Sequence, residues 1–143
     1  MEPGFLFFCF VTVIAVEKRY ILTAFDDRES GGRDMEYELK LEQEWLWILL
    51  PPEVDHYQAE RLRTAVKQKM QEQYVKYVVF DFRNTVLMDS SGIGLITGRY
   101  RELAVRGGQV YVSHVSREMQ KVLTLSGIYR IVTPLEQVMT SGE

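Results

Sequence analysis

The chain has 143 residues, of which 46% are hydrophobic and 12% aromatic, enough for the core of one domain. A formal net charge of −3 gives no electrostatic case for nucleic-acid binding. The single cysteine, Cys9, excludes an internal disulfide and fits a reducing compartment, and with only two histidines no Cys/His metal cluster is expected.

Residues 5–16 form an almost wholly apolar run near the start of the chain. The run is shorter than the roughly 20 residues that cross a bilayer, so no stable membrane insertion is expected. The segment before it carries Glu2 and neither Lys nor Arg, unlike a secretory signal. A short buried strand and a weak membrane-surface segment both remain open interpretations.

A third interpretation is that residues 1–34 are not translated. Gly31-Gly32 can be encoded by the GGAGG-type codons of a bacterial ribosome-binding sequence, and Met35 follows shortly after. The surrounding stretch, 26–34, is polar and contains glycine, which is typical of a linker. We therefore expect residues 1–34 to be a partly disordered N-terminal extension or a mis-assigned start, and residues 35–143 to be the folded domain.

Strict alternation of apolar and charged residues opens this domain, with Tyr37, Leu39 and Leu41 on the apolar side. A period of two predicts a half-buried strand. Residues 45–50 form a second apolar strand, close enough to the first for a hairpin. Pro51-Pro52 then ends the strand, because proline cannot donate to the hydrogen-bond ladder.

Asp55 is suited to cap a helix. The apolar residues after it recur at helical spacing and predict one buried face, made of Ala59, Leu62, Ala65, Val66 and Met70. Residues 77–82 are rich in β-branched and aromatic side chains, so they predict a core strand in which Val79 is fully buried.

A second amphipathic helix is predicted by the apolar spacing of residues 93–104, and it ends at Gly107-Gly108. The elements expected after it are a strand at 109–113, a helix capped by Ser116 that runs to Leu125 and stops at Gly127, a short strand at 129–132, and a short helix from Pro134. Strands that alternate with helices imply parallel pairing with right-handed crossovers. The opening hairpin adds an antiparallel edge, so the predicted fold is α/β with a mixed sheet.

The segment Met88-Asp89-Ser90-Ser91-Gly92-Ile93-Gly94 lies between the core strand and the second helix. Two hydroxyls preceded by a carboxylate thus stand where a helix begins. A helix N-terminus offers unpaired N–H groups and partial positive charge to a phosphate, whether bound or covalently attached. A pure capping role for the Asp and Ser side chains is the alternative.

Three phosphate-binding or catalytic fingerprints are absent from this segment. No Lys follows Gly94, as a P-loop requires, and no glycine stands two residues before Ser91, as a nucleophile elbow requires. Thr97 occupies the position where a dinucleotide-binding fingerprint needs a third glycine.

Residues 89–94 resemble the phosphorylation motif of STAS domains, specifically of bacterial anti-sigma factor antagonists. The resemblance continues in family order at residues 53–60, 98–101, 106–108 and 126–131, and it covers roughly residues 35–138. Among these antagonists, the sequence is most similar to those that act in sporulation. The resemblance implies a STAS-like mixed β-sheet with an N-terminal hairpin and helices packed mainly on one face.

The resemblance also implies a regulator rather than an enzyme. In this family the unphosphorylated antagonist binds an anti-sigma factor that is itself a serine kinase, and binding frees the sigma factor. The kinase then phosphorylates the serine that matches Ser91, which releases the antagonist, and a serine phosphatase restores it. A protein of this kind is cytoplasmic, needs no cofactor and binds no nucleic acid.

Ser91 is therefore the expected phosphate acceptor, and Ser90 is the expected helix cap. Asp89 either positions the Ser91 hydroxyl or holds the turn. Gly92 and Gly94 are expected to keep the surface flat so that the backbone of a partner can approach. The complete set of expected partner-binding residues is Asp55, Met88, Asp89, Ser90, Gly92, Ile93 and Gly94, of which Met88 and Ile93 belong either to the core or to the interface.

The alternative function is a STAS sensor or scaffold domain that binds a nucleotide or a small ligand. Regulation of an attached transporter would need long apolar spans, which this sequence lacks. A hydrolase that uses Ser91 would need a nearby base. The only histidines, His56 and His114, stand in no recognisable arrangement, so we expect neither a base near Ser91 nor hydrolase activity.

Overall fold

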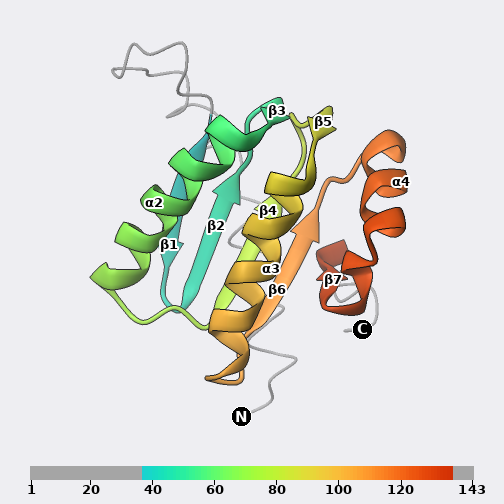
Figure 1. Cartoon of the computed structure of the whole chain (residues 1–143). Helices are drawn as coiled ribbons and strands as arrows, with labels where there is room; N and C mark the ends of the chain where they lie inside the picture. Colours follow the sequence, from blue (N-terminus) through green and yellow to red (C-terminus); the bar gives the residue numbers. More distant parts are fainter. Residues whose placement is uncertain (1–36, 137–143) are drawn as a thin grey trace. The chain divides into compact units, whose positions relative to one another are not determined.

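Five strands within residues 37–136, the part of the chain that the computed structural model describes, pair into one mixed sheet (Figure 1). In chain order they are β1 (Glu38–Glu42), β2 (Trp45–Leu49), β4 (Tyr77–Asp81), β6 (Gln109–Ser113) and β7 (Val132–Pro134), and they lie in the spatial order β1-β2-β4-β6-β7. β1 and β2 are antiparallel, and the other neighbouring pairs are parallel. The predicted α/β fold with an N-terminal hairpin is confirmed. The expectations for residues 1–34 lie outside the described residues.

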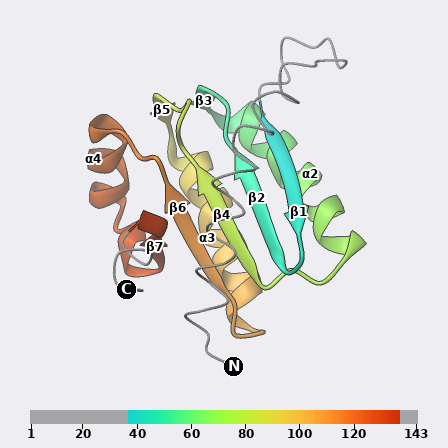
Figure 2. The same cartoon turned by 180° about the vertical axis from the view of Figure 1, so that it is seen from behind.

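The helices of the described residues are α2 (His56–Glu72), α3 (Ser90–Ala104) and α4 (Arg117–Ser126). Figure 1 shows α2 and α3 in front of the sheet, and Figure 2, from behind, shows the strands in front of these helices. In both views α4 lies beyond β6, on the β7 side. Within residues 37–136, α2 and α3 therefore cover the same face of the sheet, as the family resemblance implied.

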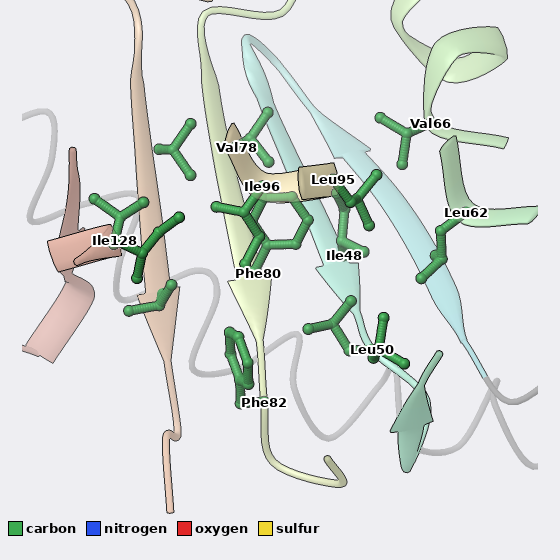
Figure 3. Packing of buried hydrophobic residues seen from close by; sticks show 14 of the residues in the cluster. Ile48, Leu50, Leu62, Val66, Val78, Phe80, Phe82, Leu95, Ile96 and Ile128 are labelled. Atoms are coloured by element: carbon green, nitrogen blue, oxygen red, sulfur yellow. The ribbon is translucent and has the colours of Figure 1, made fainter. Parts of the chain in front are cut away.

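The hydrophobic core fills the space between this face and the two helices (Figure 3). Side chains alternate across a strand, so Val78 and Phe80 of β4 point toward the helices, and both are 0% exposed. Leu62 and Val66, one turn apart on α2, and Leu95 on α3 belong to the same buried cluster. Full burial of each such side chain contributes about 1.5–3 kcal/mol.

The opposite face of β4 carries Val79, which is 0% exposed, as predicted. On neighbouring strands, Trp45 stacks on Tyr77 with 4.6 Å between ring centroids and on Tyr111 with 5.6 Å. Stacked aromatic pairs contribute beyond their buried area. This row of rings therefore links β2, β4 and β6 on the face opposite α2 and α3.

A buried carboxylate, Asp81, ends β4. Its Oδ2 accepts hydrogen bonds from Trp47 Nε1 at 3.2 Å and Arg83 Nη2 at 2.8 Å, and its Oδ1 lies 3.2 Å from His114 Nδ1. Burial raises the pKa of the Asp81 carboxyl, but the hydrogen bonds and charges of His114 and Arg83 outweigh burial and hold that pKa below its ordinary value. Asp81 therefore stays ionised and fixes the carboxyl end of β4.

Both predicted ends of α4 are confirmed, because Ser116 Oγ accepts a hydrogen bond in its first turn and Gly127 ends it with a left-handed φ of 79°. The predicted strand at 129–132 is wrong. A 3-10 helix, Ile128–Arg130, occupies its first half, and β7 begins only at its last residue, Val132. Gly127 turns the chain here, and so short an apolar run fits a turn as well as a strand. The helix expected from Pro134 falls at the end of the described residues.

Candidate functional site

A two-stranded parallel sheet, which the sequence did not predict, joins the loops that precede α2 and α3. It consists of β3 (Glu53–Val54) and β5 (Leu87–Met88), whose second residues stand opposite each other. One residue further along, Asp89 N donates to Val54 O at 3.3 Å. Because Asp55 and Asp89 directly follow β3 and β5, this pairing places the starts of the two helices side by side (Figure 1).

Further hydrogen bonds fix the same two loops. Val86 N and Leu87 N donate to Pro52 O at 2.8 and 3.2 Å. Thr85, whose side chain is buried, donates through Oγ1 to Pro51 O at 2.9 Å. Backbone groups that would otherwise lie unpaired in the loops are therefore satisfied, and the helix starts rest on a well-defined support.

Two aspartates cap the helices in the same way. Asp55 Oδ1 accepts from Gln58 N at 2.9 Å, and Asp89 Oδ1 accepts from Ser91 N at 2.8 Å. The prediction that Ser90 caps the second helix is wrong, because Ser90 is the first residue of α3. The hydrogen bond of Asp89 N within the β3–β5 pair keeps this residue extended, so the helix begins one position later. The capping role considered for Asp89 is confirmed.

Ser91 lies at the N-terminal end of α3 and is half-buried, and Ser90 beside it is exposed. Its Oγ is 3.3 Å from Nδ1 of His56, the exposed first residue of α2. The expectation that no base lies near Ser91 is therefore wrong. The two residues are 35 positions apart, and the β3–β5 pairing places the helix starts that carry them side by side. Within residues 37–136 no carboxylate is hydrogen-bonded to the His56 ring, so the third member of a hydrolytic triad is not in place.

The other residues expected to bind a partner fall into two groups. Asp55, Asp89, Ser90 and Gly94 are exposed, and Ile93 is half-buried. Met88, at 6% exposed, and Gly92 are buried and lie behind this surface. A Cβ on Gly92 would come within 2.5 Å of Met88 Cγ, so the absence of a side chain at 92 gives Met88 its room.

Three exposed apolar side chains near the site were missed by the sequence analysis. Val86 is 67% exposed, Leu87 is 57% exposed and Tyr57 is 62% exposed. Val86 and Leu87 lie at β5, and Tyr57 is the second residue of α2. Leu87 stands outward in register with the charged Glu53, but the β3–β5 pairing was not predicted, so nothing in the sequence signalled this exposure.

The polar groups around these side chains are mainly acidic. Glu53, Asp55 and Asp89 are all exposed, and the exposed His56 directly follows Asp55. No cluster of three or more metal-ligating side chains occurs in the described part of the chain. None of the helices within residues 37–136 has the length and apolar character needed to cross a membrane.

The STAS domain family matches residues 38–141. The chain belongs to this family. Over 99 residues, this STAS domain is 28% identical to an anti-sigma F factor antagonist of Paenibacillus polymyxa. The aligned residues make up 69% of this chain and 85% of that relative.

Two solved structures are similar to this STAS domain. The anti-sigma factor antagonist SpoIIAA in its unphosphorylated form aligns with a TM-score of 0.61 and 30% identity, over 67% of this chain and 84% of that one. The Bacillus cell fate determinant SpoIIAA in the phosphorylated form aligns with a TM-score of 0.56 and 31% identity, over 67% of this chain and 87% of that one. SpoIIAA is thus known in both phosphorylation states, and the STAS fold described above resembles each.

Proposed function

We propose that this STAS domain is an anti-sigma factor antagonist that phosphorylation of Ser91 switches off. The unphosphorylated form binds an anti-sigma factor that is a serine kinase, and so frees a sigma factor. The kinase phosphorylates Ser91, the complex dissociates, and a serine phosphatase restores the binding form. The observation that carries the proposal is the Ser91 hydroxyl at the surface end of α3, in a fold similar to SpoIIAA in both phosphorylation states.

The start of α3 can accept a phosphate without a change of fold. Ser91 is the second residue of the helix, where the partial positive charge of the helix N-terminus favours negative charge by roughly 0.3–1 kcal/mol. The side chain is only half-buried, so the added atoms can point to solvent. The modified protein should therefore keep the fold of the unmodified one.

A partner docked on the same surface would not accept the phosphate. The group adds about −1.5 to −2 charge, and it adds this charge beside the exposed carboxylates of Asp55 and Asp89. A partner that packs on Ser91 and on the exposed apolar side chains of the site, Val86, Leu87 and Tyr57, would desolvate the phosphate. A thousandfold loss of affinity corresponds to about 4 kcal/mol, which such a contact can lose without rearrangement.

On this proposal the protein is a cytoplasmic regulator of transcription, of the kind that acts in sporulation. It acts by binding, catalyses no reaction, and needs neither a cofactor nor nucleic acid. The acidic side chains around Ser91 favour a protein partner over a nucleic acid. A sensor or scaffold domain that binds a nucleotide or small ligand is the competing function, and it requires no kinase.

The test is phosphate transfer from the cognate anti-sigma kinase to the full chain, followed by intact mass and peptide mapping. We expect one phosphate on the wild-type protein, none on Ser91→Ala, and one on the matched control Ser90→Ala. Incorporation into Ser91→Ala at the wild-type rate would exclude Ser91 as the acceptor. Tight binding of a nucleotide by the protein alone, with no transfer from the kinase, would favour the sensor.

A further inference from the structure

His56 is the side chain from another helix that meets the Ser91 hydroxyl. The distance from His56 Nδ1 to Ser91 Oγ is 3.3 Å, and the two residues belong to α2 and α3. The chain's other histidine, His114, lies 3.2 Å from Asp81 at the end of β4. The two histidines therefore have different partners, and only His56 contacts the proposed acceptor.

We propose that His56 holds the phosphate of the modified switch, an inference that rests on the phosphorylation of Ser91 proposed above. In the unmodified protein His56 Nδ1 and Ser91 Oγ lie 3.3 Å apart, within hydrogen-bonding distance. In the modified protein the protonated ring donates a hydrogen bond to a phosphate oxygen on Ser91. His56 is thus a positioning residue, whose role is to bind and charge-balance the phosphate.

The backbone fixes where the His56 side chain starts relative to Ser91. His56 is the first residue of α2, directly after the capping Asp55, and the β3–β5 pair fixes where α2 starts relative to α3. A phosphorus atom bonded to Ser91 Oγ must lie within a few ångströms of Nδ1, since that oxygen is already at hydrogen-bonding distance.

Several neighbouring cations are already engaged. Arg63 pairs with Glu60, Arg83 pairs with Asp81, and the Arg61 guanidinium lies 5.5 Å from the centre of the Tyr57 ring. Of these basic groups and His56, the imidazole is the one that contacts Ser91. It is therefore the group placed to offset the new charge.

A positive charge on His56 would matter because carboxylates lie near the site. Asp55 and Asp89 oppose the second ionisation of a phosphate on Ser91, whose ordinary pKa is about 6. An imidazolium in hydrogen-bonding contact favours that ionisation. Other charged groups on the elements that meet here include Glu53 on β3, Glu60 and Arg61 on α2, and Arg117, Glu118 and Lys121 on α4, which packs against β5. His56 should thus keep the phosphate doubly charged near neutral pH and strengthen the off state.

Phosphorus NMR of the kinase-modified full chain tests this directly. The phosphate signal is followed through its second ionisation in the wild-type protein, in His56→Gln, which removes the charge, and in His56→Lys, which keeps a cation. His114→Gln is the matched control. We expect the apparent pKa of the phosphate to be roughly one unit higher in His56→Gln than in the wild type. His56→Lys and His114→Gln should both titrate near the wild-type value.

The outcomes separate this inference from the proposed function. Equal phosphate titration in the wild type and His56→Gln would overturn the role of His56 and leave phosphorylation of Ser91 intact. A shift of equal size in His114→Gln would also overturn it, because the effect would not be local. A kinase that adds no phosphate to Ser91 would overturn the function itself, and this inference with it.

Discussion

Val54 and Met88 stand opposite each other in the β3–β5 pair, and each is followed by the aspartate that caps a helix. Asp55 and Asp89 are therefore equivalent positions in two successive strand–helix units. Through this equivalence, hydrogen bonds between backbone groups set the distance between His56 and Ser91. Substitutions near the pair should accordingly separate effects on the fold from effects on partner binding.

Ser91→Asp tests whether negative charge at residue 91 causes the antagonist to dissociate from the anti-sigma kinase. One carboxylate carries about half the charge of a phosphate, so affinity for the anti-sigma kinase should fall roughly ten- to hundredfold, about 1.4–2.8 kcal/mol. Ser91→Ala should bind as tightly as the unphosphorylated wild type and should hold the sigma factor released. The measurement is a binding titration of each variant at fixed salt. Equal affinity for Ser91→Asp and the wild type would leave phosphorylation in place but would count against charge as the release mechanism.

Asp89→Ala and Ser90→Ala should differ in stability. Asp89 supplies the capping oxygen of α3, so its loss should lower the free energy of unfolding by about 0.5–2 kcal/mol. The exposed Ser90 has no such role, and its substitution should change stability by less than about 0.5 kcal/mol. Urea unfolding measures both. A larger loss for Ser90→Ala than for Asp89→Ala would mean that α3 starts elsewhere in solution.

Leu87→Ser tests the apolar part of the proposed contact surface. Leu87 is 57% exposed, so the fold should lose little stability. Affinity for the kinase should fall roughly tenfold, about 1.4 kcal/mol, if this side chain packs against the partner. Leu125→Ser is the matched control, since Leu125 is 88% exposed on α4. Similar affinities for the two variants would show that β5 is not part of the interface with the kinase.

The stability of the fold should fall at low pH because the Asp81 carboxylate becomes protonated. Its pKa in the folded protein lies below its ordinary value, so the carboxylate stabilises the fold fully above the unfolded pKa of about 3.9. That contribution is lost as the pH falls through the folded pKa. Asp81→Asn should lower the free energy of unfolding at neutral pH by about 3 kcal/mol and flatten the acid limb of the stability curve. Parallel curves for the variant and the wild type would contradict this assignment.

A chain that begins at Met35 should fold as the full chain does. The family match starts at residue 38, and β1 starts at Glu38, so the STAS unit lies within residues 35–143. We expect the midpoint of thermal unfolding to stay within a few degrees of that of the full chain. A larger decrease would show that residues 1–34 contribute to the folded domain.

Long periodic segments made most of the fold predictable. The alternation at Tyr37, Leu39 and Leu41 identified β1, and the helical spacing of Leu62 and Val66 identified the buried face of α2. The cap of α3 was harder, because Asp89 and Ser90 both suit an N-cap. The choice between them depends on the hydrogen bond of Asp89 N to Val54 O, a tertiary contact.

The geometry around Ser91 could not be predicted for the same reason. β3 and β5 have two residues each, too few to show a period of two. Without that pairing, nothing local places His56 near a serine 35 positions away. The motif predicted Ser91 as the phosphate acceptor, but its contact with His56 became visible only in the folded structure.

The β3–β5 pair also has a consequence for how such proteins diverge. Its register rests on backbone hydrogen bonds, and its inward residues, Val54 and Met88, are buried. The outward positions, Glu53 and Leu87, can therefore change during evolution without moving the serine. On the proposed function, substitutions at these two positions offer duplicated copies a route to separate partners while the phosphorylated serine stays in place.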